Sequence, residues 1–280
     1  MEIALAILLL FFVYLIVDNN NLWITKQNLV FDTLPEEFDG VKIIQLADLH
    51  TKTFGKNNNR LIKAVKKQLP DYILLCGDMV SRDCTDFTAI ENLLRSLAEI
   101  CPVYYSLGNH EIDMSADMKS ELFTAIKRAS VTLLNNETNT IKKGKSSIRI
   151  VGASLLRENY RCKATGYKEL RSYELSDLDN AIGSKQGFTI LLAHNPFFAQ
   201  TYFKWGAELI LSGHVHGGVI RLPFIGGLLS PERKFFPKYS KGIYTRSSSS
   251  MSVSRGLGKL RIFNPPEIVL IKLNKTNDEA

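Results

Sequence analysis

Cysteine is scarce in this sequence, and it is not spaced for metal binding or for disulfides. The 280-residue chain has four cysteines (Cys76, Cys84, Cys101 and Cys162), and no two of them form a CxxC pair. A structural zinc knuckle and a disulfide framework are therefore disfavoured. A Gly-rich dinucleotide loop after the first predicted strand and a Walker-type lysine motif are also missing, so no nucleotide cofactor is expected.

Acidic residues are outnumbered by basic ones, which favours an anionic partner. Lys and Arg total 35 against 28 Asp and Glu, and the formal net charge is +7. Such a partner would carry phosphate groups, be a nucleic acid, or be an acidic lipid. The basic residues are scattered, apart from a cluster between Arg221 and Arg246. Because no second domain is evident that could grip a duplex, nucleic acid is the least favoured of the three.

One long hydrophobic run is present, and it opens the chain. Ile3–Val17 carries no charge, and as a helix it would span roughly 22 Å, while the segment counted from Met1 reaches the low end of the transmembrane range. A cleaved signal peptide usually has a basic start and a small-residue cleavage site. Here Glu2 is the only early charge, and Asp18–Asn21 offers no such site. The sequence therefore predicts an uncleaved single-pass anchor.

The remainder of the chain has the composition of one globular domain. Apolar residues make up 45% and charged residues 22% of the sequence, which are ordinary globular values. With no internal repeat and no clear boundary after residue 25, we expect an anchor over 1–24, one domain over 25–275 and a polar tail over 276–280. Lys26 is the only basic residue close to the downstream end of the anchor, which favours a cytoplasmic side for the domain.

Strands and helices alternate along the first half of this domain, which indicates an α/β fold. After a lead-in segment at Asn28–Asp39, the pattern predicts strands at 42–47, 72–76 and 103–106, with helices at 60–69, 86–100 and 115–129 between and after them. Further strands are expected at 131–134, 148–151, 188–193 and 208–211, with a short helix at 197–204. The strands expected at 243–245, 251–254 and 267–273 are assigned to the second half of the sheet system.

Polar side chains follow the apolar strands, and all five histidines of the chain are among them. The set at these strand exits is Asp48, His50, Asp78, Asn109, His110, His194, His214 and His216. Each residue alone would be an ordinary turn or loop residue. Together they indicate a functional site, because α/β proteins build their sites at the carboxyl ends of parallel strands.

The segment Leu211–Gly218 is the densest part of this series. His214 and His216 are separated by one residue and are flanked by glycines. In extended backbone, side chains two positions apart point to the same side. Two neutral imidazoles on the same side can coordinate one metal ion.

The motifs at the strand exits are, in chain order, D-x-H, G-D, G-N-H-E, H-N-P and G-H-x-H-G-G. This series resembles that of the calcineurin-like metallophosphoesterase family, and the resemblance covers nearly the whole chain after the anchor. Flanking runs at Leu34–Gly40, Gly217–Pro223 and Val253–Gly258 are similar to the bacterial branch whose members carry an N-terminal membrane segment. The resemblance implies a sandwich of two mixed β-sheets flanked by helices. One departure is Phe197-Phe198 after His194-Asn-Pro, where relatives often carry an acidic residue.

The resemblance also implies seven metal ligands and one catalytic histidine. The ligands would form two groups joined by one aspartate: Asp48, His50 and His216 for the first ion, Asn109, His194 and His214 for the second, and Asp78 for both. His110 would be the catalytic residue. Two divalent ions would clamp a phosphate and activate a water, as hydroxide, for attack on phosphorus. Imidazole, carboxylate and amide ligands suit Mn²⁺, Fe or Zn²⁺ better than Ca²⁺.

The substrate is less determined than the chemistry. Arg221–Tyr244 mixes apolar and basic residues, which suits an anionic lipid head group at a membrane surface and equally a lid that packs on the sheet. The resemblance extends to hydrolases of UDP-2,3-diacylglucosamine, so a lipid-linked phosphodiester or pyrophosphate is expected. The alternatives are a tethered phosphodiesterase or phosphatase for soluble nucleotide or cell-wall phosphates, and a non-catalytic scaffold of the same fold. The scaffold is disfavoured because every expected ligand and His110 are present.

Overall fold

The computed structural model describes residues 1–160, 170–218, 220–222, 226–229, 235–259 and 261–276. Cys162, most of the expected polar tail, and residues 223–225 and 230–234 of the Arg221–Tyr244 segment lie outside the described part. Cys76, Cys84 and Cys101 are free thiols.

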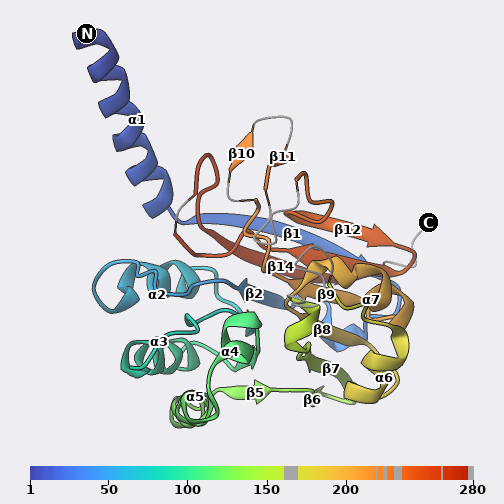
Figure 1. The fold of residues 1–280 in the computed structure, drawn as a ribbon. Helices are drawn as coiled ribbons and strands as arrows, with labels where there is room; N and C mark the ends of the chain where they lie inside the picture. Colours follow the sequence, from blue (N-terminus) through green and yellow to red (C-terminus); the bar gives the residue numbers. More distant parts are fainter. Residues whose placement is uncertain (161–169, 219, 223–225, 230–234, 260, 277–280) are drawn as a thin grey trace.

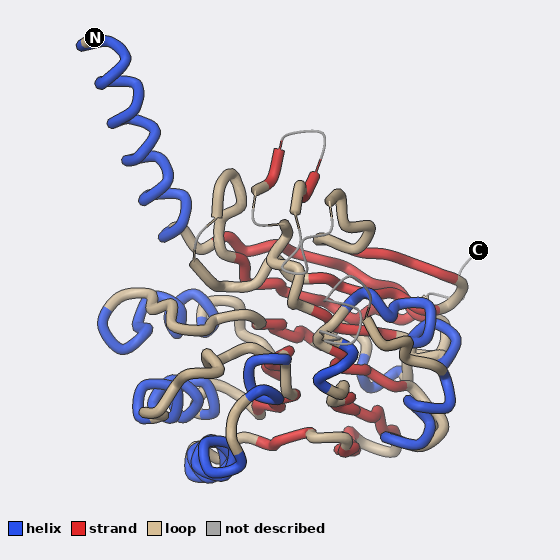
Figure 2. Tube along the Cα trace, in the orientation of Figure 1, coloured by secondary structure: helices blue, strands red, loops and turns tan. Residues whose placement is uncertain are grey.

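Two six-stranded sheets form the body of the protein (Figures 1 and 2). The first sheet has the order β1 (Trp23–Phe31), β14 (Glu267–Lys275), β2 (Lys42–Leu46), β3 (Tyr72–Cys76), β4 (Val103–Ser106), β5 (Thr132–Leu134). The second has the order β12 (Gly242–Arg246), β13 (Ser249–Val253), β9 (Leu209–Ser212), β8 (Thr189–Ala193), β7 (Ser146–Ala153), β6 (Glu137–Lys143). Both sheets are mixed, since β14 is antiparallel to β2 and the outer pairs β12–β13 and β6–β7 are antiparallel.

Helices cover the outer face of each sheet. The first sheet packs against α2 (Asn59–Lys66), α3 (Thr88–Ala98) and α5 (Ala116–Arg128), and the second against α6 (Leu175–Ile182) and α7 (Ala199–Trp205). Shorter elements are α4 (Asn109–Asp113), the pair β10 (Arg221–Leu222) and β11 (Gly226–Gly227), and 3-10 turns at Glu36–Phe38, Lys56–Asn58, Arg157–Asn159 and Pro196–Phe198. This arrangement confirms the expected fold of two mixed sheets flanked by helices.

The central strands are apolar on both faces because helices and the opposite sheet cover them. In β3, Leu74 packs into the core between the two sheets, whereas Ile73 and Leu75 pack toward the helices of the first sheet. In β8, Leu192 enters the same central core and Leu191 faces α6 and α7. Three hydrophobic cores thus lie between four layers, and they hold the strand ends in fixed positions.

Two expectations about the strands were wrong. The lead-in segment predicted at Asn28–Asp39 contains the end of β1, which pairs in parallel with β14 from Trp23–Glu267 to Phe31–Lys275. The strand predicted at 267–273 does form, but it lies in the first sheet and not with the second half of the chain. Alternate burial of Gln27, Leu29 and Phe31 shows that β1 follows the two-residue period of a strand with one covered face.

The N-terminal helix α1 (Glu2–Asn20) extends away from the body (Figure 1). It has a mean hydropathy of 2.1 and no buried residue, and it is long and apolar enough to cross a membrane. Its last turn is bound to the body: the Asn19 side chain donates to the Arg261 carbonyl (2.7 Å) and accepts from the Arg261 backbone N–H (3.0 Å). The Tyr14 ring contacts the Phe263 ring at 5.4 Å between centroids.

Candidate metal centre

The carboxyl ends of strands from both sheets meet at one edge of the sandwich. β2, β3 and β4 are parallel neighbours that end just before Asp48, Asp78 and Asn109. β8 and β9 are parallel neighbours in the second sheet, and they end just before His194 and the turn that carries His214 and His216. The loops after these five strands therefore carry the predicted site residues.

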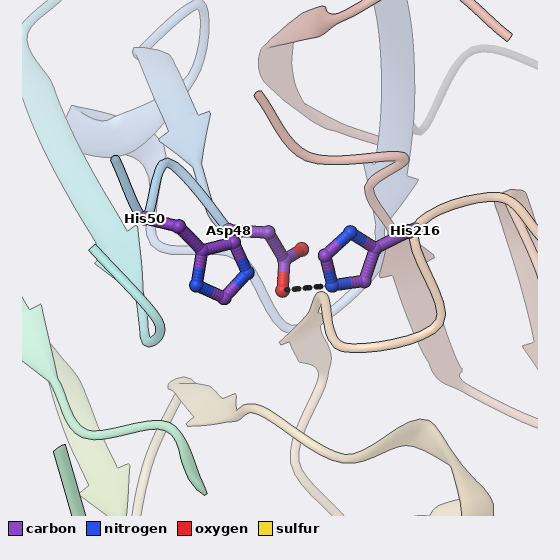
Figure 3. Close-up of side chains that lie close together, drawn as sticks. All are labelled: Asp48, His50 and His216. Carbon is purple, nitrogen blue, oxygen red and sulfur yellow. Dashed lines mark ion pairs between the residues drawn. The ribbon is translucent and has the colours of Figure 1, made fainter. Parts of the chain in front are cut away.

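Asp48, His50 and His216 form a first group (Figure 3). One potential ligand atom from each lies within 4.8 Å of the other two. The His216 Nε2 atom is 3.5 Å from Asp48 Oδ1, and the His50 and His216 rings stack at 5.3 Å with an angle of 7° between them. A cation placed among them would meet one carboxylate and two imidazoles.

Asp78, His194 and His214 form a second group, and all three are buried. The His194 Nε2 atom lies 3.2 Å from Asp78 Oδ2 and 3.7 Å from Asp48 Oδ1. Asp78 also forms a group with His50 and His110. Its carboxylate therefore lies between the two sets of ligands, which is the placement that a bridging ligand requires.

The predicted ligand residues fit metal ions because several of their polar atoms face one another without a partner. His194 Nδ1 lies 2.5 Å from the Cys76 carbonyl oxygen, so that nitrogen donates, and Nε2 of the neutral ring has a lone pair directed at Asp78. Among the described residues, His194 Nε2, Asn109 Oδ1 and His50 Nδ1 are buried atoms without a hydrogen-bond partner. Buried acceptors that face each other repel unless a cation lies between them.

Burial sets the protonation of the histidines in the first group. It lowers the pKa of His50 to about 4 and that of His216 well below its ordinary range. Both rings are therefore neutral at pH 7, which is the form that binds metal. For His194, burial favours the neutral ring, but Asp78 outweighs it and raises the pKa to about 10. The space beside His194 Nε2 is thus one that favours positive charge.

Backbone packs closely against the two aspartates, and glycine is required for this. A Cβ on Gly108 would lie 2.3 Å from Asp78 Oδ1, and one on Gly256 would lie 2.5 Å from Asp48 Oδ2. Gly213 is similar, with a Cβ position 2.7 Å from Asp48 Oδ2. Side chains at these positions would displace the carboxylates from their present places.

The backbone at the site is not extended, which corrects the expectation for His214 and His216. Five site residues have left-handed φ angles: Asp48 (53°), His50 (51°), Asp78 (53°), His214 (68°) and His216 (54°). Such angles are uncommon outside glycine and often occur at functional sites. The two histidines consequently enter different groups and do not share one face as extended backbone would place them.

Glu111 is a buried residue of the G-N-H-E motif to which the sequence assigned no role. Its carboxylate accepts backbone N–H groups from Asp78 (2.9 Å), Met79 (2.8 Å) and Gly108 (2.9 Å), and the Tyr105 hydroxyl (2.7 Å). Burial, followed by the charge of Asp78, raises the pKa of Glu111 to about 7. Glu111 joins the loops after β3 and β4, and so it fixes the position of Asp78.

His110 lies at the rim of the site, where it is partly exposed. Its backbone N–H donates to Asp78 Oδ1 at 2.8 Å, and its ring centroid is 4.4 Å from that of His50. The Arg82 guanidinium lies 3.1 Å from His110 Nε2 and is paired with Asp113 at 2.8 Å. The sequence did not single out Arg82, because no motif separates it from the other scattered basic residues.

Comparisons with known proteins agree with this geometry. The model of the family described as calcineurin-like phosphoesterase matches residues 41–218. A Bacillus subtilis (strain 168) protein, described as uncharacterized metallophosphoesterase YkuE, is 30% identical over 90% of this chain and 86% of its own length. Phosphodiesterase YaeI of Escherichia coli (strain K12) is 29% identical, over 83% of this chain and 82% of its own. UDP-2,3-diacylglucosamine pyrophosphatase LpxG of Chlamydia muridarum is 26% identical, over 85% and 86%.

Proposed function

This chain belongs to the calcineurin-like phosphoesterase family and is a metal-dependent phosphoester hydrolase, and we propose that it cleaves a phosphodiester or pyrophosphate bond at a binuclear metal centre while α1 anchors it to a membrane. The main support is the pair of groups in which His194 Nε2 faces Asp78 and Asp48 in a buried space. That arrangement is stable only with positive charge between the groups.

The proposed ligands follow the two groups in the structure. Asp48, His50 and His216 would hold one ion, His194 and His214 with Asn109 would hold the other, and Asp78 would be the ligand shared between them. When bound, two divalent ions supply a Lewis-acid clamp for the phosphate and a nucleophile at neutral pH. The ligand types are those preferred by Mn²⁺, Fe and Zn²⁺. The Cys76 carbonyl holds His194 in the tautomer that leaves Nε2 free to bind.

His110 is proposed to give a proton to the leaving oxygen. Its backbone bond to Asp78 keeps the ring beside the bridging ligand, and its partial exposure lets it reach a bound ester. Burial lowers the pKa of His110, with Asp78 acting in the opposite direction. The lowered pKa reduces the fraction of the ring that is protonated at pH 7 but makes the proton that it holds easier to transfer.

A lipid-linked substrate is proposed from the N-terminus of the chain and from one relative. No residue of α1 is buried although the helix is apolar, so its surface needs an apolar surrounding. The relative LpxG is named for a diacylated sugar nucleotide, which it cleaves as a pyrophosphatase. UDP-2,3-diacylglucosamine, or another lipid with a phosphodiester or pyrophosphate, is therefore the proposed class of substrate.

The hydrolytic claim is tested with bis-p-nitrophenyl phosphate and the full chain in nonionic detergent, after metal removal and after addition of Mn²⁺. Restored hydrolysis that disappears in Asp78→Asn is the expected result. Equal activity with and without metal would refute the claim.

The lipid claim is tested separately by comparing UDP-2,3-diacylglucosamine with UDP-N-acetylglucosamine. We expect kcat/KM for the acylated compound to be higher by at least about tenfold, because each buried methylene of an acyl chain contributes roughly 0.8 kcal/mol. Equal values would indicate a soluble phosphate ester as the substrate.

A further inference from the structure

A cavity of about 710 Å³ lies beside the end of α1, apart from the residues proposed to hold metal. We call it the α1 cavity. Tyr14 and Asp18 of α1 and Trp23 of β1 form part of its wall. The wall also contains four basic residues: Arg221, Lys238, Lys241 and Arg255. Its volume is in the range of sites that bind small molecules.

Positive charge in the α1 cavity exceeds negative charge. Asp18 is the acidic residue among the described residues that line it, and Arg255 is already paired with Glu267 at 3.2 Å. Burial lowers the pKa of Lys241, and the charges of Arg255 and Arg221 lower it further. The Arg255 Nε atom is buried and has no hydrogen-bond partner among the described residues. Neighbouring cations that are partly buried and incompletely neutralised make a site for an anion.

The rim of the α1 cavity is aromatic and exposed. Trp23, Phe236 and Phe263 have 52%, 59% and 43% of their surface exposed, and all three line the cavity. They lie at the body end of α1, the apolar helix without buried residues. Exposed aromatic side chains at the end of an apolar helix are typical of the boundary between hydrocarbon and head groups.

More basic residues surround the same end of α1. Lys52 donates to the Asn20 side chain at 2.9 Å, and Arg60 donates to the Asn20 carbonyl at 3.0 Å. The β10–β11 hairpin, which begins at Arg221, rises from the same face of the body as α1 (Figures 1 and 2). A bilayer around α1 would therefore bring its head groups to this basic surface.

The α1 cavity also adjoins the loop that carries His216. The Arg221 side chain donates to the Gly217 carbonyl at 3.0 Å, and the Asn264 side chain donates to the Gly218 carbonyl at 2.9 Å. Gly227, which lines the cavity, approaches Gly218 so closely that a Cβ on Gly218 would lie 2.6 Å from its Cα. The cavity and the proposed metal centre thus lie on either side of one glycine loop.

We propose that the α1 cavity binds the phosphate-bearing head group of an anionic membrane lipid, with the acyl chains of the lipid lying along α1. Arg221, Lys241 and Lys238 neutralise the phosphate, and the aromatic rim contacts the glycerol and the first methylenes. A soluble anion would satisfy the cations but not the rim or the apolar side of α1. This site is additional to the proposed function, since it requires neither bound metal nor hydrolysis.

Trp23 provides a direct readout because it lines the cavity. We would titrate the metal-loaded full chain in nonionic detergent with dihexanoylphosphatidic acid, dihexanoylphosphatidylcholine and inorganic phosphate, and follow tryptophan fluorescence. Trp23→Phe identifies the signal, since Trp205 is the only other tryptophan. Arg221→Gln and Lys241→Gln each remove one cation, and Lys142→Gln on β6 is the matched control at an exposed site.

Phosphatidic acid is expected to bind more tightly than phosphatidylcholine or inorganic phosphate. Arg221→Gln and Lys241→Gln should each weaken that binding by about tenfold, the effect of one charge-assisted hydrogen bond, while Lys142→Gln leaves it unchanged. If neither cavity variant weakens binding, the proposal is wrong. If inorganic phosphate binds as tightly as the lipid, the cavity is a site for a soluble anion. Hydrolysis of bis-p-nitrophenyl phosphate by the Lys241→Gln variant should match that of the parent chain, so loss of lipid binding is distinguished from loss of the metal centre.

Discussion

The Nε2 atom of His194 lies 3.2 Å from the Oδ2 atom of Asp78, and both side chains are almost completely removed from water. The opposite nitrogen of the ring is engaged by the Cys76 carbonyl. The facing atoms therefore need a positive charge, either a proton on the ring, whose pKa Asp78 raises to about 10, or a metal ion between them. Because Asp48 Oδ1 is only 3.7 Å from the same nitrogen, two buried carboxylates share this need for positive charge. The predictions that concern metal follow from this relationship.

Removal of metal should destabilise the protein. Chelation leaves Asp48 and Asp78 buried beside each other, and the compensating positive charge must come from His194 and neighbouring groups such as Arg261. At a metal concentration a hundred times the Kd, bound metal contributes about 2.7 kcal/mol, so the midpoint of thermal unfolding should fall by roughly 5–10 °C on chelation. Differential scanning calorimetry with and without Mn²⁺ measures this. An unchanged midpoint in a sample shown to have lost its metal would contradict the prediction.

His110→Ala should lose turnover but keep its metal. The residue touches Asp78 through its backbone N–H, which alanine retains, and its ring lies at the partly exposed rim. The rate of bis-p-nitrophenyl phosphate hydrolysis should fall by about 10² to 10⁴, the usual contribution of a general acid. Metal analysis of the same sample provides the control. Activity equal to that of the parent chain would remove His110 from the mechanism.

Glu111→Gln should destabilise the fold although it changes only one atom. The two carboxylate oxygens accept from four backbone N–H groups and the Tyr105 hydroxyl, and an amide would direct its own N–H groups at some of these donors. We expect a loss of about 2–3 kcal/mol in urea unfolding. Glu91→Gln, which removes pairs with the exposed Arg95 and Arg128, is the control and should cost no more than about 1 kcal/mol. Similar losses for the two variants would show that Glu111 does not organise the loops.

Gly256→Ala should reduce metal binding by displacing Asp48. Its φ angle is +73°, and the added Cβ would lie 2.5 Å from Asp48 Oδ2. Gly206 also has a positive φ angle, +91°, but a Cβ there meets nothing within 4 Å. Gly206→Ala therefore carries the backbone strain alone, about 1–2 kcal/mol, and should keep full metal content. If both variants retained metal equally, close packing against Asp48 would not be required.

The sequence predicted the elements near the site better than it predicted their partners. The strands at β2, β3 and β4 are short apolar runs that end in polar motifs, so local pattern was sufficient to place them. β1 was missed because its pairing with β14 joins residues about 240 positions apart, and no local signal reports such a contact. β14 was assigned to the wrong sheet for the same reason.

Within the site, residue types were predictable and conformations were not. The position of His214 and His216 beside glycines indicated that they are metal ligands. Their left-handed φ angles and their separation into two groups are visible only in the structure. Glu111 received no role because its importance depends on burial and on five donors from two segments of the chain that are about 30 residues apart. Arg261, which is almost fully buried with Nη2 3.5 Å from His216 Nδ1, carries no motif at all.

The number of metal ions per chain tests the central claim most directly. The purified full chain would be dialysed against Mn²⁺ and analysed by mass spectrometry of its metal content, beside Asp78→Asn. Two ions per parent chain, and one or fewer in Asp78→Asn, are predicted, because the aspartate lies within ligand distance of His194 and His214 and also of His50. A parent chain that binds a single ion, or an Asp78→Asn variant that still binds two, would contradict a binuclear centre bridged by Asp78.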